Sequence, residues 1–448
     1  MLNFEEAKGR AADLVKRATK AGADAADAVY SGNASRDVQV RLGALEDVGD
    51  AEGEDIGLRV FVGQQSASVS SSDLSVRTLE ALAERAVAMA RQAPVDAFAG
   101  LAPADRLMTG RVPDLAIVDT AAPSPQYMRE RALVAEEAAR GVPGVTNSEG
   151  AGVSQGAAVV GLATSHGFAG AYGGTSHSIS ASVLAGEGSG MERDYAYHTT
   201  RFLADLDDAS LIGRQAGERA VSRLSPVRLK SGPMTVIFDP RVGSSLIGHL
   251  MGAISGSGIA RKTSFLLDQL DQAIFAPGIT IIDDPLRPKG LRSRPFDGEG
   301  LPAARHIVIR DGVLTGWLME SASARQLGLE PSGHASRGIS GAPGVATSNL
   351  HMEPGSVTPA ELMADVKSGF YVTDLIGMGV NGLTGDYSRG ASGFLIQNGV
   401  IGGAVSEVTI AGNLKNMFAR LVPANDLDFR YGTNVPTLRI DGMMIAGE

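Results

Sequence analysis

The sequence predicts an α+β protein, with N-terminal helices on one face of a mostly antiparallel sheet and a C-terminal, mixed β-rich half. Three observations support this prediction. Apolar residues recur at helical spacing in several segments of the first half. Stretches of period-two alternation lie between and after these segments. Turn-forming dipeptides bound the strands of the second half. This order of elements is typical of helices covering one face of a sheet.

Three helices are expected before residue 145. The first follows Asn3, which forms a capping-box-like start with Glu6, and it ends at Gly22. The second spans about residues 75–92 and carries apolar residues on one face. The third spans 124–141 and has proline at its first helical position, where proline is tolerated.

Strands are expected between and after these helices. Short ones lie at 38–42, 56–62 and 66–69. From 145 to 201 the sequence is rich in Gly, Ser, Ala and Thr and has period-two stretches, which predicts long hairpins with little side-chain bulk. A further helix spans about 208–224.

A domain boundary is expected at Ser225-Pro226, where proline breaks this last helix. A chain of 448 residues is too long for one ordinary hydrophobic core. We therefore expect an N-terminal α+β domain over residues 1–224 and a C-terminal β-rich domain over residues 225–448.

Turn-forming residues predict where strands and helices of the second half begin and end. Strands are expected to end at the Asp-Pro turns of residues 239–240 and 284–285. Asp311-Gly312 and Asn398-Gly399 are strong signals for two-residue hairpins. The segment Thr358-Pro359-Ala360-Glu361 is a complete capping box that begins a short helix.

Composition limits the class of protein. The chain is 44% hydrophobic and 20% charged, which is ordinary for a soluble globular protein. It has no apolar run of about 20 residues, so we expect no membrane span. Its first residues have neither the basic nor the apolar region of a secretory signal. A net charge of −10 and the lack of a Lys/Arg run argue against direct nucleic-acid binding. We expect a cytoplasmic protein.

Metal chemistry has little support in the sequence. The chain has no cysteine, which excludes disulfides, Cys-ligated zinc, iron–sulfur clusters and thiol nucleophiles. No two histidines are three or four residues apart, so no helix offers a His pair to one ion. We therefore expect no metal and no cofactor in this chain. The seven histidines are His166, His177, His198, His249, His306, His334 and His351.

Two glycine motifs are better explained by hairpins. The segment Gly152–Gly156 matches the nucleophile-elbow pattern around Ser154, but a strand-like stretch follows where that motif needs a helix. The segment Gly186–Gly190 lacks the Gly-Lys-Ser/Thr ending of a phosphate loop and predicts a hairpin tip. An independent hydrolase that uses Ser154 stays open as a hypothesis.

Two polar stretches beside glycines carry more hydrogen-bonding groups than a structural loop requires. Glycine lets another chain approach the backbone closely, and these side-chain types can satisfy the polar groups of a peptide. A peptide in extended form can also pair with an exposed strand edge. The alternative is a pair of ordinary, well-bonded loops. The candidate substrate- or partner-facing residues are Arg261, Lys262, Thr263, Ser264, Asp386, Tyr387, Ser388 and Arg389.

Five longer segments contain these residues or lie near them, namely Arg261–Phe265, Phe296–Pro302, Ser323–Leu329, Thr384–Phe394 and Val405–Leu414. In this order they resemble the PmbA (TldE) branch of the TldD/PmbA peptidase family. The likeness covers essentially the whole chain and is strongest from residue 230 onward. Several low-degeneracy segments in one order make a chance match improbable.

The resemblance implies where metal chemistry would lie. In the TldD branch a helix bearing His-Glu-x-x-x-His binds zinc, and a C-terminal Cys completes the site. That helix corresponds roughly to residues 247–252 here, with its ligands near Ile247 and Gly252 and its Glu near Gly248. His249 is close but not in a ligand position. No catalytic or metal-binding residue is therefore carried over to this chain.

The resemblance instead implies a heteromeric protease. A TldD-like partner would supply zinc, whose bound water attacks the amide. This chain would complete a chamber and help to hold an extended, unfolded peptide. The alternative is a peptide-binding or scaffolding homo-oligomer without protease activity. Self-association of this chain into a homodimer in the absence of its partner stays open.

Overall fold

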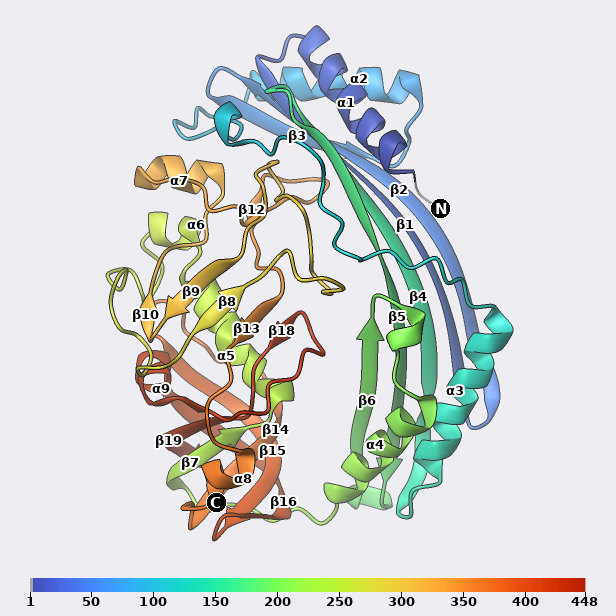
Figure 1. Ribbon diagram of the computed structural model, residues 1–448, viewed down its shortest axis with the longest axis vertical. Coiled ribbons are helices and arrows are strands. Elements are labelled where there is room, and N and C mark those ends of the chain that lie inside the picture. The colour runs from blue at the N-terminus through green and yellow to red at the C-terminus, as the bar shows by residue number, and fades with distance from the viewer. Residues whose placement is uncertain (1–2, 448) are drawn as a thin grey trace.

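The computed structural model describes residues 3–447 and has two parts, a long curved sheet and a more compact β-rich body (Figure 1). The curved sheet is built from strands that end by residue 200, and the body from strands that begin at residue 232. Residues 223–231, which include Ser225-Pro226, connect the two parts. Within residues 3–447 no helix is both long and apolar enough to cross a bilayer.

Six antiparallel strands form the curved sheet in the order β3-β2-β1-β4-β5-β6. The Gly/Ser-rich region forms the long hairpins that its alternation predicts. The first two strands are far longer than the segments expected at 38–42 and 56–62, because polar residues and glycines before them also pair across the ladder. The bounds are β1 Ala25–Arg41, β2 Ala44–Val62, β3 Gln65–Ser71, β4 Val145–Thr164, β5 Ala169–Ala185 and β6 Glu192–Thr200.

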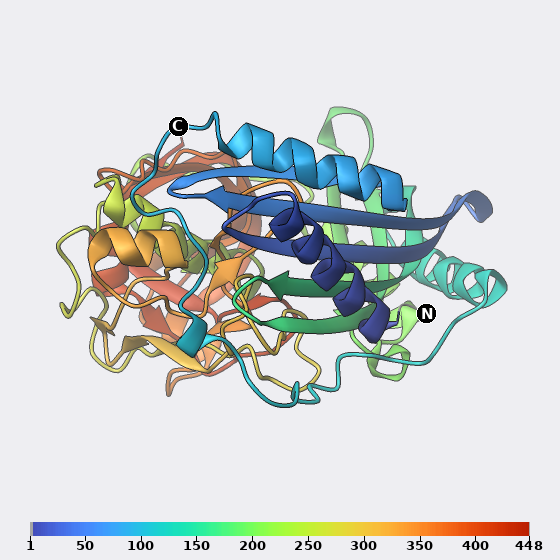
Figure 2. The same ribbon diagram turned by 90° about the horizontal axis from the view of Figure 1, so that it is seen from above.

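Four helices cover one face of this sheet, which confirms the predicted arrangement. On β1, Tyr30 packs in the cluster under the first two helices, and Val38 packs in the cluster under the other two. Residues an even number apart on a strand share a face, so both helix pairs lie on the same side. Seen from above, the first helix (darkest blue) crosses the strands obliquely, and the second (lighter blue) runs nearly along them (Figure 2). The bounds are α1 Phe4–Lys20, α2 Val76–Ala90, α3 Pro125–Arg140 and α4 Ala209–Ser222.

Five strands of the β-rich body close into a ring. The order is β16-β15-β14-β7-β19, and β19 also pairs with β16. The pairing of β14 with β7 is parallel and the others are antiparallel, so the sheet is mixed as predicted. Helices α5 and α9 contribute to the core of this body. The bounds are β7 Gly232–Phe238, α5 Pro240–Ala253, β14 Ser368–Ile376, β15 Asp386–Gln397, β16 Val400–Asn413, α9 Leu414–Arg420, β17 Val422–Pro423 and β19 Leu438–Ala446.

Smaller elements complete the body. A second sheet has the order β10-β9-β8-β13-β18, and β11 pairs with β12. Asp311-Gly312 and Asn398-Gly399 have positive φ at both positions, as the two-residue hairpin turn requires, so both turn predictions are confirmed. The capping box at Thr358 forms both of its hydrogen bonds. The bounds are α6 Gly256–Ala260, β8 Ile281–Asp283, β9 His306–Arg310, β10 Val313–Leu314, α7 Ser321–Leu327, β11 Ala335–Ser336, β12 Gly344–Val345, β13 Leu350–Met352, α8 Pro359–Met363 and β18 Thr433–Asn434.

Buried charges join the two parts at one end of the curved sheet. Arg59 of β2 and Arg337 of the body both bond the carboxylate of Asp27, the latter at 2.8 Å. Beside them the rings of Phe168 and Phe296 meet edge to face, with centroids 5.0 Å apart. These contacts fix the body against the sheet face that the helices leave free.

Candidate functional site

The two predicted polar stretches meet at one open hollow of about 660 Å³. Thr263 lines it from the turn after α6, and Asp386–Ser388 line it from the start of β15. The rest of the lining is the connection from β14 to β15, residues 378–383. The two stretches are more than a hundred residues apart in the chain, so only the tertiary fold brings them together.

The first stretch is a tight turn with an exposed outer side. Arg261, Lys262 and Thr263 are exposed, and Lys262 has a φ of 58°, in the left-handed region. Ser264 is buried, and its hydroxyl donates to the carbonyl of Ala253 at 2.6 Å. The Ser264 hydrogen bond therefore anchors the turn to the end of α5. The side chains of residues 261–263 remain exposed at the surface.

The second stretch begins with a firmly held carboxylate. Asp386 accepts from the Thr384 hydroxyl at 2.7 Å and from the Asn413 amide at 3.0 Å. These bonds, the Thr384 bond most of all, lower the pKa of Asp386, because they favour its charged form. Ser388 is also exposed beside the hollow. Asp386 thus presents a charged acceptor to the hollow at neutral pH.

Tyr387 and Arg389 lie deeper than the sequence suggests. The Tyr387 side chain is 1% exposed and belongs to the core of the body. Its ring meets that of His249 of α5 edge-on. Within residues 3–447, Nε2 of His249, the hydroxyl of Tyr387 and Nε of Arg389 are buried without a hydrogen-bond partner. Three such atoms in one place are unusual, since buried polar groups are normally satisfied.

Burial sets the protonation of this cluster. Desolvation lowers the pKa of His249, and the positive charge of Arg389 lowers it further. Desolvation raises the pKa of Tyr387 to about 12, against a smaller opposing effect of Arg389. His249 and Tyr387 are therefore both neutral near pH 7, and each can donate or accept one hydrogen bond.

Helix α5 presents a bare face beside this cluster. Gly248 and Gly252 are exposed and four residues apart, so they lie on one side of the helix. A Cβ added at either glycine would meet no atom within 4 Å. Another chain could therefore approach the helix backbone closely here.

An apolar loop above the hollow is a feature that our sequence analysis missed. Ile376, Met378 and Leu383 are 62%, 87% and 61% exposed. The signal was present in the sequence, because apolar residues alternate with glycines between residues 376 and 383. An exposed apolar cluster of this kind often marks an interaction surface.

The side chains on α5 do not fit a zinc ion. Ile247, Gly248 and Gly252 offer no ligand atom, and His249 packs against Tyr387. Over residues 3–447, no three His, Asp or Glu side chains gather closely enough to hold one metal ion. Zinc at structural and catalytic sites takes at least three such ligands.

The two glycine motifs have structural roles. Ser154 lies in the middle of β4, paired with Asp37 of β1 and Ser178 of β5, and not on a strand-to-helix turn. Gly186–Gly190 joins β5 to β6 at a hairpin tip, as predicted. Neither motif has the geometry that its chemistry requires.

Family models match nearly the whole chain in three consecutive pieces. They are PmbA/TldA metallopeptidase domain 1 at residues 26–90, the central domain at 119–224 and the C-terminal domain at 231–447. The chain is 38% identical to Metalloprotease PmbA of Escherichia coli O157:H7, over 99% of this chain and 96% of the relative. This chain belongs to the PmbA/TldD metallopeptidase family. It is also 35% identical to the PmbA homolog of Haemophilus influenzae, over 97% of this chain and 94% of that one.

Solved structures with high overall similarity share the fold. A protein from Bacteroides thetaiotaomicron, described as a candidate modulator of DNA gyrase, has a TM-score of 0.91 and 29% identity over 100% of both chains. TldE from Thermococcus kodakarensis has a TM-score of 0.86 and 20% identity over 97% of this chain and 99% of that one. Both likenesses support the fold. Both agree with the α+β architecture described above.

Proposed function

We propose that this chain is the non-metal-binding subunit of a TldD/PmbA-type peptidase that processes or degrades unfolded peptides in the cytoplasm. One observation carries the proposal. Beside the bare face of α5, His249, Tyr387 and Arg389 leave three buried polar atoms without partners, and no metal-ligand set accompanies them among the residues that the structure describes. A site of this kind suits the holding of a polar chain better than the activation of water.

In this proposal, catalysis resides in a TldD-like partner. Zinc bound there would supply a hydroxide-like water that attacks the peptide bond. The residues of this chain bind the peptide and orient it. The glycine face of α5 gives a peptide backbone room to approach. Peptide binding would have to open the buried Nε2 of His249 and hydroxyl of Tyr387, both neutral near pH 7, so that each can bond to one peptide N–H or C=O. The apolar loop at residues 376–383 is positioned to cover the hollow together with the partner.

The first experiment tests which of the two chains carries the peptidase activity. The purified chain, a TldD-like chain and their mixture are assayed for cleavage of an unfolded peptide. We expect no cleavage by this chain alone, and cleavage by the mixture that a zinc chelator abolishes. Cleavage by this chain alone that survives the chelator would overturn the proposal and revive the hypothesis of a hydrolase based on Ser154.

A variant then tests the cluster itself. Arg389→Ala in the mixture should reduce peptide cleavage or partner binding, while the melting temperature of the chain stays nearly fixed. Arg310→Ala, which removes an exposed cation on β9, serves as the control and should change neither quantity. A loss of activity that only follows a loss of stability would assign Arg389 a structural role.

A second candidate is a peptide-binding or scaffolding homo-oligomer without protease activity. The exposed apolar loop favours it equally, because such a loop can pair with a second copy as well as with a partner. Sedimentation of the chain alone and with the TldD-like chain distinguishes the two. A homodimer that persists in the presence of that chain would favour the second candidate.

A further inference from the structure

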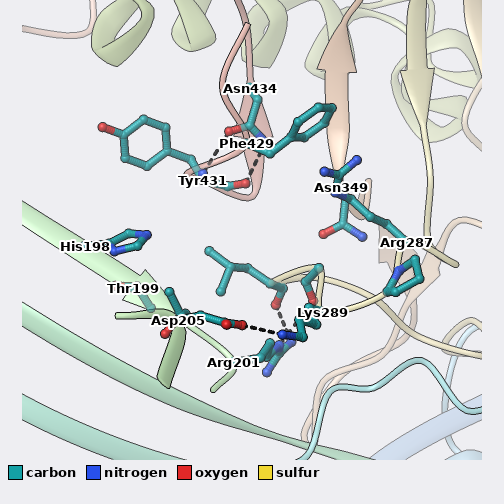
Figure 3. A pocket seen from close by; sticks show the side chains of 14 residues that line it. His198, Thr199, Arg201, Asp205, Arg287, Lys289, Asn349, Phe429, Tyr431 and Asn434 are labelled. Carbon is teal, nitrogen blue, oxygen red and sulfur yellow. Dashed lines mark hydrogen bonds and ion pairs between the residues drawn. The ribbon is translucent and has the colours of Figure 1, made fainter. Parts of the chain in front are cut away.

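A second cavity, of about 350 Å³, lies between the end of β6 and two loops of the body. Figure 3 shows side chains from both parts pointing into it. The β6 side contributes residues 198–201 and Asp205, and the body contributes residues 287–291, Asn349, Phe429, Tyr431 and Asn434. It is separate from the hollow at the start of β15, since the two cavities share no lining residue.

Arg287 is the unusual residue of this cavity. Its guanidinium carbon lies 3.4 Å from the centroid of the Phe429 ring, so one face of the group is covered. The ring of His351 in turn supports Phe429, with centroids 5.1 Å apart. Across residues 3–447 no carboxylate pairs with Arg287 and no acceptor bonds its guanidinium N–H groups. A stacked guanidinium keeps its N–H edges free for a planar anion.

The other charges of the cavity leave an excess of positive charge. Lys289 is paired with Asp205, at 2.7 Å between Nζ and Oδ2. Arg201 donates to the carbonyls of Thr175 and Gly290, at 3.0 and 3.1 Å, and adds a charge that no carboxylate of the described chain pairs with. Three cations thus face one carboxylate here, in a chain whose net charge is −10. An anion would be favoured at this place.

The free edge of β6 reaches the same cavity. The Tyr195 carbonyl accepts from Arg219 and its amide donates to Asp194, so the backbone groups of Tyr195 point away from β5. Alternate residues of a strand direct these groups to the same side. Those of Tyr197 and Thr199 therefore lie on the free edge, where no backbone or side-chain group of the described chain bonds to them. A free edge of this kind can accept an added strand.

We propose that this cavity binds the C-terminal carboxylate of an extended peptide, with Arg287 on the carboxylate and the preceding residues paired along β6. The proposal rests on the proposed function, because it names the part of the peptide that this chain would recognise. A carboxylate suits the site better than a phosphate for two reasons. One planar guanidinium is unpaired, which matches one planar anion. An adjacent strand edge offers hydrogen bonds that only a peptide backbone can use.

The test uses the full chain and one unfolded, fluorescently labelled peptide in two forms, with a free C-terminal carboxylate and with a C-terminal amide. Fluorescence anisotropy measures the affinity of each. We expect the free acid to bind about tenfold more tightly, as one charge-assisted pair implies. Arg287→Gln should remove this difference and leave the affinity for the amide unchanged. Arg310→Gln, outside the cavity, should preserve the difference.

The remaining outcomes all contradict the proposal. Equal binding of the two forms by the natural chain, or a preference for the acid that survives Arg287→Gln, would exclude a carboxylate site at Arg287 while leaving peptide holding intact. Binding of neither form would contradict both this proposal and the proposed function. Displacement of the acid by sub-millimolar inorganic phosphate in the natural chain, absent in Arg287→Gln, would assign the cavity to phosphate.

Discussion

The ring of His249 meets the ring of Tyr387 edge-on, with centroids 6.0 Å apart and planes inclined at 76°. The first belongs to α5 and the second to β15, and Arg389 follows two residues later on the same strand. Because each of these side chains has a buried polar atom without a partner within residues 3–447, the cluster is incomplete as a hydrogen-bond network. Under the proposed function, a bound peptide or a partner subunit completes it.

Tyr387→Phe tests whether the unpaired hydroxyl of this cluster serves peptide binding. The hydroxyl has no partner to lose, so the free energy of unfolding should change by less than about 0.5 kcal/mol. Peptide cleavage by the assembled pair should nevertheless fall, because a donor to the peptide is gone. Chemical denaturation and a cleavage assay measure the two quantities.

Tyr371→Phe is the matched control. The Tyr371 hydroxyl donates to Asp239 at 2.9 Å, and Asp239 caps α5. This change should lower the free energy of unfolding by about 1–2 kcal/mol, since it removes a bond to a carboxylate. Equal stability losses in the two variants would show that the Tyr387 hydroxyl has a partner in the isolated chain.

The bare face of α5 gives a second prediction. Gly248→Ala should raise the free energy of unfolding by about 0.5–1 kcal/mol, because glycine disfavours a helix interior and the added methyl meets nothing. Gly248→Leu should have a free energy of unfolding similar to that of Gly248→Ala. It should nevertheless weaken peptide binding, since its side chain fills the approach to the helix. Gly213→Ala in α4 is the contrast. Its Cβ would lie 1.9 Å from the carbonyl oxygen of Ala135, so the change should destabilise the chain. Unchanged peptide binding by Gly248→Leu would remove α5 from the site.

Local signals in the sequence predicted much of the fold. Asp311-Gly312 and Asn398-Gly399 specify their turns through their own φ preferences, which need no distant contact. The full lengths of β1 and β2 could not be predicted, because their polar residues pair through the backbone and show no apolar alternation. The meeting of Thr263 with Asp386 and the stacking of Arg287 on Phe429 depend on contacts between distant segments, which no local pattern encodes.

Acid should destabilise the protein. Burial lowers the pKa of five histidines, so the unfolded chain binds more protons than the folded chain below the ordinary histidine pKa of about 6.5. The histidine contribution to the free energy of unfolding should therefore be fully retained above pH 6.5 and fall as the pH drops from there towards the lowered values. Urea unfolding at pH 7.5 and pH 5.5 measures this, and a His249→Gln variant should show a smaller difference. A chain more stable at pH 5.5 would contradict the prediction. The five are His177, His198, His249, His306 and His351.

The purified chain should hold no stoichiometric zinc. The reason is chemical, because α5 presents isoleucine and glycine where ligands would stand and the chain has no cysteine. Elemental analysis of the chain before and after dialysis against a chelator measures the content. About one tightly bound zinc per chain, lost when a single histidine is replaced, would contradict both this prediction and the proposed division of labour.

The apolar loop at residues 376–383 should form part of the surface that binds a partner. Met378 is 87% exposed, so replacing it by lysine removes almost no buried surface within the chain, and the free energy of unfolding should change by less than about 0.5 kcal/mol. If the loop is buried against a TldD-like chain, the charge must be desolvated there, and the affinity should fall at least about tenfold. Val95→Lys provides the control, because Val95 is 68% exposed on the other part of the molecule and should have no such effect. Titration of each variant with the TldD-like chain gives the affinity, and sedimentation of each variant alone gives the state of self-association. Loss of a homodimer in Met378→Lys, with the affinity for the TldD-like chain unchanged, would assign the loop to pairing between copies of this chain and favour the homo-oligomer over the mixed pair.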